Sequence, residues 1–327
     1  MKKIFVLILT LVILSSHDMF LKLDTYFLKP NDFATIKLFN GTFDNSDNVI
    51  TRDRMFDVSL IGGGQRKAVD TAQWSEKDNT TFLHFTSGNS GTWVAGVSIK
   101  PRTLAMKAQD FNHYLDHDGV TDMLEWRKVN NALETDAVEE YSKHVKVIFQ
   151  VGGKVTEDYK SILGYPLEFV PMQNPYTLHS GQTLPIQLLW QGKALTNQLV
   201  YLGIKSHEYN HDHIHEEGHE HADGSDHHHQ DAASGLRTDA NGMITIDLNE
   251  EGIYYLRTIH LINSAKEGMT HESNWATLTF EIGHGHNHEH VHTHHHDDLL
   301  IPGYIYIIAS IALIAGLFFW FNRSSGK

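Results

Sequence analysis

The sequence of 327 residues contains no cysteine. This absence excludes disulfide frameworks, cysteine-based zinc fingers, iron–sulfur clusters and thiol catalysis. Basic residues are also few, since 26 Lys and Arg compare with 40 Asp and Glu and give a formal net charge of −14. A nucleic-acid-binding protein needs a basic face for phosphate, so this net negative charge argues against that class. Histidine, by contrast, is abundant at 25 residues, and this composition indicates metal bound through imidazole and carboxylate groups.

The N-terminal segment has the pattern of a secretory signal peptide. In residues 1–16, Lys2 and Lys3 precede an apolar run that ends in small residues. We predict cleavage after Ser16, which makes His17 the first residue of the mature protein. An uncleaved N-terminal anchor is the alternative, but the apolar run is short for a membrane span.

The C-terminal segment predicts a transmembrane helix. Residues 299–321 contain no charged side chain and, as a helix, would span about 34 Å, enough for the hydrocarbon core. Arg323 and Lys327 follow this segment, and basic residues stay in the cytoplasm. We therefore predict a single-pass membrane protein with residues 17–298 in the periplasm and residues 322–327 as a short cytoplasmic tail.

Between these two ends the sequence pattern is mainly β. Short apolar or alternating runs separated by turn residues predict antiparallel strands from Phe20 to Lys100 and from Pro166 to Ile282. Helical spacing of apolar residues from Met106 to Tyr141 predicts two or three short helices. We predict two antiparallel β-sandwich domains, the second resembling immunoglobulin or transthyretin-like modules, with a short helical insertion and one C-terminal transmembrane helix. The predicted segments are 17–152 for the first sandwich with its helical insertion at about 106–143, 153–283 for the second with a histidine-rich loop at 207–229, and 284–298 for a histidine-rich juxtamembrane linker.

Two segments hold 17 of the 25 histidines. They read HEYNHDHIHEEGHEHADGSDHHH and HGHNHEHVHTHHH, and neither composition can bury a core. Neutral imidazoles beside carboxylates bind Ni, Co, Zn or Cu(II), whereas the alternative interpretation is a solvated acidic linker. The predicted metal ligands in these two tracts are His207, His211, His213, His215, His219, His221, His227, His228, His229, His284, His286, His288, His290, His292, His294, His295 and His296.

The same tracts contain three HExxH matches, at His207–His211, His215–His219 and His288–His292. In a zinc protease this motif works because a helix places both histidines on one face. None of the three lies in a helical apolar pattern, so composition explains them and a metalloprotease is not predicted. The sequence offers no acid–base pair or nucleophile arrangement with useful spacing, and we predict that the protein is not an enzyme.

Three histidines outside the tracts are further candidate ligands. A free N-terminal His17 offers its amine and imidazole as a chelating pair, as in a copper brace, and His260 and His271 are candidates to complete such a site. The alternative is that His17 begins an edge strand and the other two are structural. His113 and His117 are four residues apart, which predicts one helix face, either as a metal pair or as a solvated surface.

Several segments resemble one family in sequence and in order. The stretches HDMFLKL, YSKHVKVIFQVGG, LGYPLEFVPMQNPYTLHSGQTLPIQLL and HESNWATLTFE are similar to bacterial nickel-uptake-transporter-like periplasmic proteins, and the resemblance covers residues 17–283. It implies an exported protein that assists metal uptake, and it supplies no catalytic residues.

We therefore expect a membrane-anchored extracytoplasmic protein that binds a divalent transition metal (Ni, Co, Zn or Cu) and assists its uptake or buffering. Its expected partners are metal ions, the membrane and a metal permease, and not nucleic acid. Residue spacing does not distinguish these metals. The alternative is an exported copper-binding protein or copper enzyme that uses an N-terminal His brace.

Overall fold

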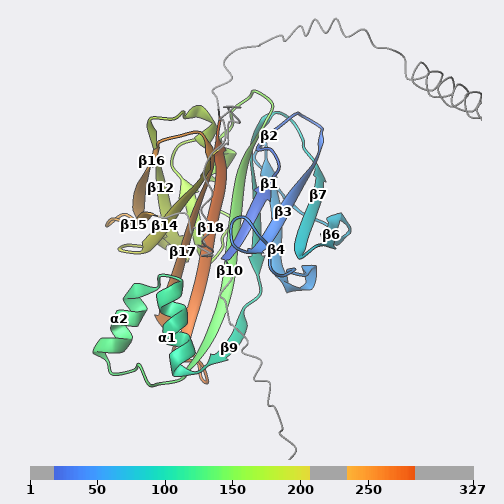
Figure 1. Cartoon of the computed structure of the whole chain (residues 1–327). Helices are drawn as coiled ribbons and strands as arrows, with labels where there is room; N and C mark the ends of the chain where they lie inside the picture. Colours follow the sequence, from blue (N-terminus) through green and yellow to red (C-terminus); the bar gives the residue numbers. More distant parts are fainter. Residues whose placement is uncertain (1–17, 207–233, 284–327) are drawn as a thin grey trace, which may run out of the picture. The chain divides into compact units, whose positions relative to one another are not determined.

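Three β-sheets and two helices form the part of the protein that the computed structural model describes, which is residues 18–206 and 234–283 (Figure 1). The predicted signal peptide and the predicted transmembrane segment lie outside these residues. Within the described ranges, no helix is long and apolar enough to cross a membrane.

The first sheet has four strands in the order β1-β3-β7-β6, and the third has β11-β12-β13 with β16 also paired to β12. The central sheet runs β15-β14-β17-β18-β10-β8-β4-β5, and β2 and β9 pair with β10. The strands are β1 (Asp18–Leu23), β2 (Phe27–Leu28), β3 (Phe33–Gly41), β4 (Met55–Gly62), β5 (Gln65–Ala68), β6 (Trp74–Lys77), β7 (Thr80–Thr86), β8 (Gly91–Ile99), β9 (Arg102–Met106), β10 (Ala137–Val151), β11 (Leu167–Pro171), β12 (Gln182–Trp190), β13 (Lys193–Ala194), β14 (Leu199–Ser206), β15 (Ser234–Arg237), β16 (Met243–Leu248), β17 (Gly252–Asn263) and β18 (His271–Ile282). The helices are α1 (Ala108–His117) and α2 (Thr121–Val129).

The central sheet contains strands from both predicted sandwiches. β10, from the first, pairs in parallel with β18, from the second, in a register that runs from Glu139↔His271 to Val147↔Thr279. All other strand pairs in this sheet are antiparallel except that of β2 with β10. The prediction of a mainly β protein is therefore confirmed. Strands predicted to form two separate sandwich domains instead share one continuous central sheet.

Alternating side chains of the central sheet pack into different cores. On β10, Val147 and Phe149 join the core beneath the first sheet, whereas Ile148 joins the core beneath the third sheet. This alternation follows from the two-residue period of a strand. Both faces of β10 are covered, so consecutive residues in the middle of this strand, Val147 to Phe149, are apolar. This is the pattern of a strand buried on both faces.

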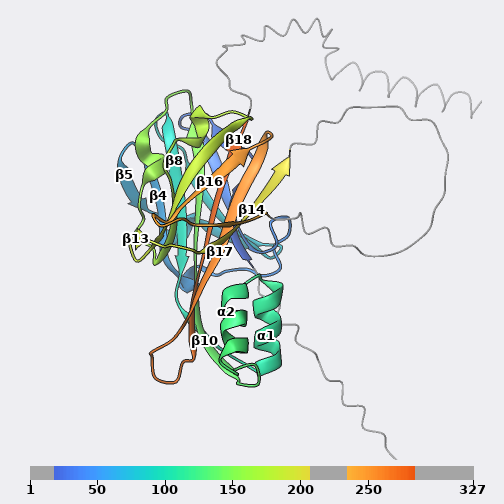
Figure 2. The same ribbon diagram turned by 90° about the vertical axis from the view of Figure 1, so that its left-hand side faces the viewer.

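The helices form a third, smaller core. Phe111 and Leu115 of α1 are fully buried and pack with Ile259 of β17 and Trp275 of β18. Figure 2 shows α1 and α2 beside the end of the long strands, where β9 and the start of β10 also lie. The predicted two or three short helices are thus two.

The predicted helical insertion extends too far toward the C-terminus. Residues 137–143 belong to strand β10 rather than to the insertion, which was expected to reach about residue 143. The polar side chains Glu139, Ser142 and Lys143 occupy buried positions there, so the hydrophobic alternation that identifies a strand is absent. Pairing with β9 on one side and β18 on the other keeps this segment extended.

The triple glycine at 62–64 forms the turn between β4 and β5. Gly63 and Gly64 have φ values of 61° and 75°, the left-handed values that a two-residue hairpin turn requires. Their N–H groups donate to the carboxylate of Asp158 at 3.0 and 2.8 Å. The segment therefore binds a side chain of the protein itself.

Candidate functional site

The two histidine-rich tracts are attached at the same end of the central sheet. Ser206, the last residue of β14, pairs with Gly252 of β17, and Gly252 pairs with Ile282 near the end of β18. These three strands are neighbours (Figure 2). Because adjacent strands lie about 4.8 Å apart, the residues before His207 and His284 are separated by only about 10 Å across the sheet.

Most predicted ligands lie outside the described residues. This applies to His17, which directly precedes β1, and to all the tract histidines: His207, His211, His213, His215, His219, His221, His227, His228, His229, His284, His286, His288, His290, His292, His294, His295 and His296.

The two remaining predicted ligands are described, and each is engaged in the fold. His260 Nδ1 lies 2.9 Å from Gln198 Oε1, and its ring packs against Trp190 with 4.8 Å between ring centroids. His271 is buried, with Nδ1 2.7 Å from Thr270 Oγ1. Burial lowers the pKa of His271 to about 4, so this ring is neutral at physiological pH.

These two histidines do not converge on a common point. His260 pairs across the sheet with Asn274, whereas His271 pairs with Asn263, which places them three residues apart along their shared ladder. Within residues 18–206 and 234–283, no cluster of three or more His, Asp or Glu side chains could hold a metal ion.

Helix α1 does bring His113 and His117 to one face, as their spacing predicts. Their ring centroids are 6.0 Å apart, and His117 Nδ1 lies 2.9 Å from Oδ1 of the buried Asp118. A carboxylate that orients an imidazole in this way is common behind metal-binding histidines. Two histidines without a third protein ligand, however, fit a solvated helix surface as well as they fit a metal site.

A buried histidine network, which the sequence did not reveal, lies between β10 and β18. His144 Nε2 is 3.0 Å from Asn274 Oδ1, and His144 Nδ1 is 2.9 Å from Ser98 Oγ. Ser142 Oγ donates to the same Asn274 oxygen at 2.9 Å. Desolvation lowers the pKa of His144 to about 4, so the network holds a neutral imidazole.

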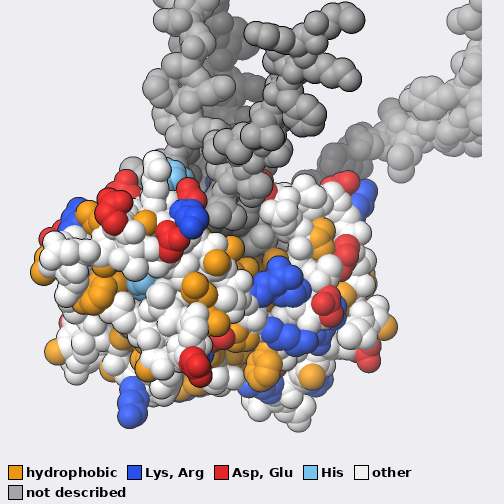
Figure 3. Space-filling model, turned by 90° about the horizontal axis from the view of Figure 1, so that it is seen from below, with side chains coloured by type: hydrophobic (Ala, Val, Ile, Leu, Met, Phe, Trp, Pro, Cys, Tyr) orange, Lys and Arg blue, Asp and Glu red, His pale blue; other side chains and the backbone are white. Residues whose placement is uncertain are grey.

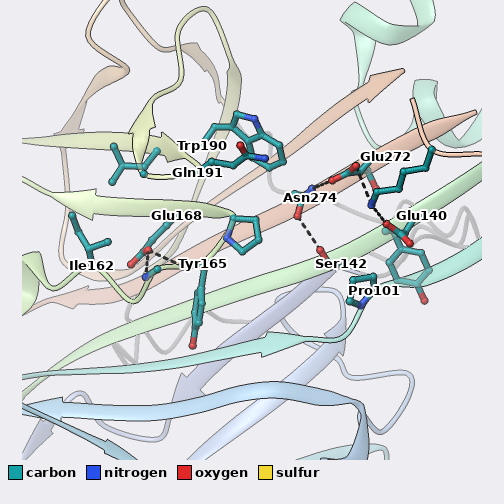
Figure 4. Close-up of a pocket in the computed structure, with 17 residues that line it drawn as sticks. Pro101, Glu140, Ser142, Ile162, Tyr165, Glu168, Trp190, Gln191, Glu272 and Asn274 are labelled. Atoms are coloured by element: carbon teal, nitrogen blue, oxygen red, sulfur yellow. Dashed lines mark hydrogen bonds and ion pairs between the residues drawn. The ribbon is translucent and has the colours of Figure 1, made fainter. Parts of the chain in front are cut away.

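Ser142 and Asn274 of this network also line a pocket of about 530 Å³ (Figure 4). Its walls include Trp190 and Tyr165, and Glu140 and Glu272 lie at one end. Lys266 forms ion pairs with both of these carboxylates, so their negative charge is partly neutralised. The pocket therefore presents aromatic and amide surface, with partly neutralised carboxylates at one end.

The wall of this pocket also contains one end of a buried ion pair. Lys146 Nζ lies 2.9 Å from Glu168 Oε1, and both side chains are at most 2% exposed. Glu168 additionally accepts hydrogen bonds from the backbone N–H groups of Leu163, Gly164 and Tyr165. With all its acceptors used, Glu168 is a structural residue that joins β10 to β11.

A second pocket of about 480 Å³ opens between α1, β9 and the central strands β10 and β18. It is lined by Arg54, Arg102 and Lys143 together with apolar side chains. Figure 3 views the molecule from the lower end of Figure 1, where α1 and β9 lie, and shows Lys and Arg side chains gathered beside hydrophobic ones around a hollow. Composition, with its excess of acidic residues, gave no sign of this local basic group.

Solved structures with detectable similarity are distant. The D0-D1 domain of intimin shares 11% identity with this chain, covers 80% of it and 97% of its own length, and gives a TM-score of 0.18. Escherichia coli alpha-2-macroglobulin activated by porcine elastase shares 7% identity over 82% of this chain and 20% of its own, with a TM-score of 0.19. No curated protein matches the sequence. These similarities are too low to support an argument about the fold or the site.

The sequence does match one family model. The match covers residues 14–262, which include the start of β1, both helices, the first histidine-rich tract and most of the central sheet. On this match, the chain belongs to the family described as Domain of unknown function (DUF4198).

Proposed function

We propose that the protein is a membrane-anchored extracytoplasmic binder of divalent transition metals that assists metal uptake or buffering. The observation that carries the proposal is the attachment of both histidine-rich tracts at one end of the central sheet, at Ser206 and Gly283. Two groups of ligands tethered about 10 Å apart have a high effective concentration for each other. Imidazoles from both tracts can therefore ligate the same ion.

The order of segments along the chain supports a role near a membrane. The second tract lies between β18 and the predicted transmembrane segment at 299–321. In this proposal, ions bound by the tracts are held close to the membrane face, where a permease takes them up. Only the family resemblance favours nickel, since cobalt, zinc and copper suit the same ligands.

The alternative proposal, a copper site or copper enzyme at His17, depends on the surroundings of β1. Asp18 lies 3.4 Å from Nε of Arg257, and Arg257 Nη1 donates to the backbone oxygen of Asp118 at 3.1 Å. The carboxylate next to His17 in the sequence is thus engaged in an ion pair within the fold, and the described residues bring no cluster of ligands to this end of β1. We therefore place the main metal sites in the tracts and propose no catalytic activity.

Metal binding should weaken as the pH falls below about 6. Imidazole binds metal only when neutral, and its unperturbed pKa is about 6.5. If two or more imidazoles ligate each ion, the affinity for Ni or Zn should fall at least about tenfold between pH 7 and pH 5.5. Calorimetric titration of the full-length protein at several pH values checks this, and a curve that is flat from pH 7 to 5 would mean that carboxylates bind the metal.

This titration needs a control for the fold itself. His144 and His271 have pKa values of about 4 in the folded protein and about 6.5 when unfolded. Their stabilising contribution is complete above about pH 6.5 and is lost as the pH falls toward 4, because the unfolded state then binds more protons. Circular dichroism at each pH separates loss of ligands from loss of structure.

A further inference from the structure

The pocket between α1, β9 and the central strands has the size of a small-molecule site. Its volume of about 480 Å³ lies within the range of roughly 300–1,000 Å³ that is typical of ligand pockets. One part of its wall is apolar, and Ile50, Leu104, Met106 and Trp275 contribute to it. Such a wall favours a ligand with an apolar body.

The other part of the wall is cationic. Lys143 is only 6% exposed, its Nζ lies 4.8 Å from the centre of the Trp275 ring, and it donates to Asn40 Oδ1 at 3.3 Å. Burial lowers the pKa of Lys143 to about 8, because desolvating an ammonium group is unfavourable. Nη2 of Arg54 is also buried and has no hydrogen-bond partner among the described residues. Arg102 adds an exposed guanidinium to the same wall.

Lys143 already has carboxylates in electrostatic range, with Asp18 and Asp118 acting on it more strongly than Glu139. Burial raises the pKa of Glu139 to about 7, and this carboxyl group is hydrogen-bonded to Tyr114 OH at 3.2 Å and to Ser273 Oγ. Glu139 also lies four residues from Lys143 on β10, about 13 Å along the strand. The other acidic side chain of the wall, Asp110, is exposed on α1. Two guanidinium groups and one ammonium group thus share a pocket with an exposed carboxylate and a buried one whose ionisation is suppressed.

We propose that this pocket binds a small organic carboxylate with an apolar body, its carboxylate against Lys143, Arg54 and Arg102 and its body against Trp275 and Met106. Arg and Lys form charge-assisted hydrogen bonds with carboxylates, which are stronger than those between neutral groups. A carboxylate would accept a hydrogen bond from the buried guanidinium nitrogen of Arg54, which has no partner among the described residues. The proposal is independent of metal binding by the tracts.

The test compares two ligands of the same shape that differ in charge. We use 3-phenylpropanoate and its neutral analogue 3-phenylpropanamide, titrated by calorimetry into the full-length protein at pH 7. The acid should bind saturably and about tenfold more tightly than the amide. Equal affinity of the two, or no saturable binding of the acid, would overturn the proposal.

Variants locate the binding. Lys143→Met keeps the length of the side chain and removes its charge, and it should weaken binding of the acid about tenfold without changing that of the amide. Arg102→Gln, an exposed position that cannot disturb the core, should weaken the acid several-fold. Lys193→Gln, an exposed lysine on β13 outside the pocket, is the matched control and should change neither. If Lys143→Met fails to fold, Arg102→Gln alone decides, and unchanged affinity in that variant would contradict the assignment.

Discussion

Removal of residues 207–229 and 284–296 should eliminate most of the Ni or Zn that the full-length protein binds, while its β-sheets remain folded. The reason is that these segments hold 17 of the 25 histidines, whereas the described residues contain no cluster of three or more candidate ligands. Metal content after dialysis, measured by elemental analysis, should fall from several ions per chain to about one or none.

The strand geometry permits the first deletion. Leu202 of β14 pairs with Ser234. The chain that leaves Ser206 therefore has to run back along about four residues of β14 to reach Ser234, a distance of about 14 Å. Residues 230–233 remain after the deletion and can span this distance, since five Cα–Cα steps reach about 17 Å. Circular dichroism of the deletion variant should match that of the parent protein.

A second variant identifies the ligands within the tracts. It keeps both segments and their carboxylates but carries Gln in place of the 17 histidines. Metal content should fall as far as in the deletion variant, because neutral imidazole supplies the binding in our proposal. Retention of metal in the Gln variant but not in the deletion variant would assign the sites to Asp and Glu.

Glu168→Ala should destabilise the fold by about 3–5 kcal/mol, the range observed when one partner of a buried ion pair is removed. The variant leaves Lys146, which is 2% exposed, without its counter-ion, and three backbone N–H groups lose their acceptor. Desolvation already lowers the pKa of Lys146. For a domain of this size the change corresponds to a decrease in Tm on the order of 10 °C, measured by thermal unfolding.

Glu157→Ala provides the matched control. Glu157 also pairs with a lysine, Lys160, at 2.5 Å, but these side chains are 71% and 56% exposed. An exposed ion pair contributes about 0–1 kcal/mol, so Tm should change little. Equal effects of the two substitutions would mean that burial does not determine the strength of the Lys146–Glu168 interaction.

The strands were predictable where hydrophobic alternation is uninterrupted. Both regions predicted to hold strands, Phe20 to Lys100 and Pro166 to Ile282, contain them, and β4 and β16 are examples. The start of β10 was not predictable, because Glu139, Lys143 and His144 occupy buried positions that usually hold apolar side chains. Nor could a local pattern predict that β10 pairs with β18, since that contact joins segments about 130 residues apart.

The candidate sites were predictable only in part, for a related reason. Composition identified the histidine tracts, because their chemistry is repeated along the sequence. The basic pocket was missed because Arg54, Arg102 and Lys143 are far apart in sequence. They come together only in the folded protein, Arg54 from the turn before β4, Arg102 from β9 and Lys143 from β10. Conversely, His260 and His271 were candidates by residue type, yet hydrogen bonds to Gln198 and Thr270 engage them in the fold.

The central claim is that tract imidazoles bind the metal, and histidine modification with and without Ni tests it most directly. Diethyl pyrocarbonate modifies accessible neutral imidazoles, and mass spectrometry of the full-length protein locates each modified residue. We predict that Ni protects the histidines at 207–229 and 284–296, while the exposed His113 and His179 are modified equally in both conditions. Unprotected tracts, or protection confined to His113 and His117, would contradict the account.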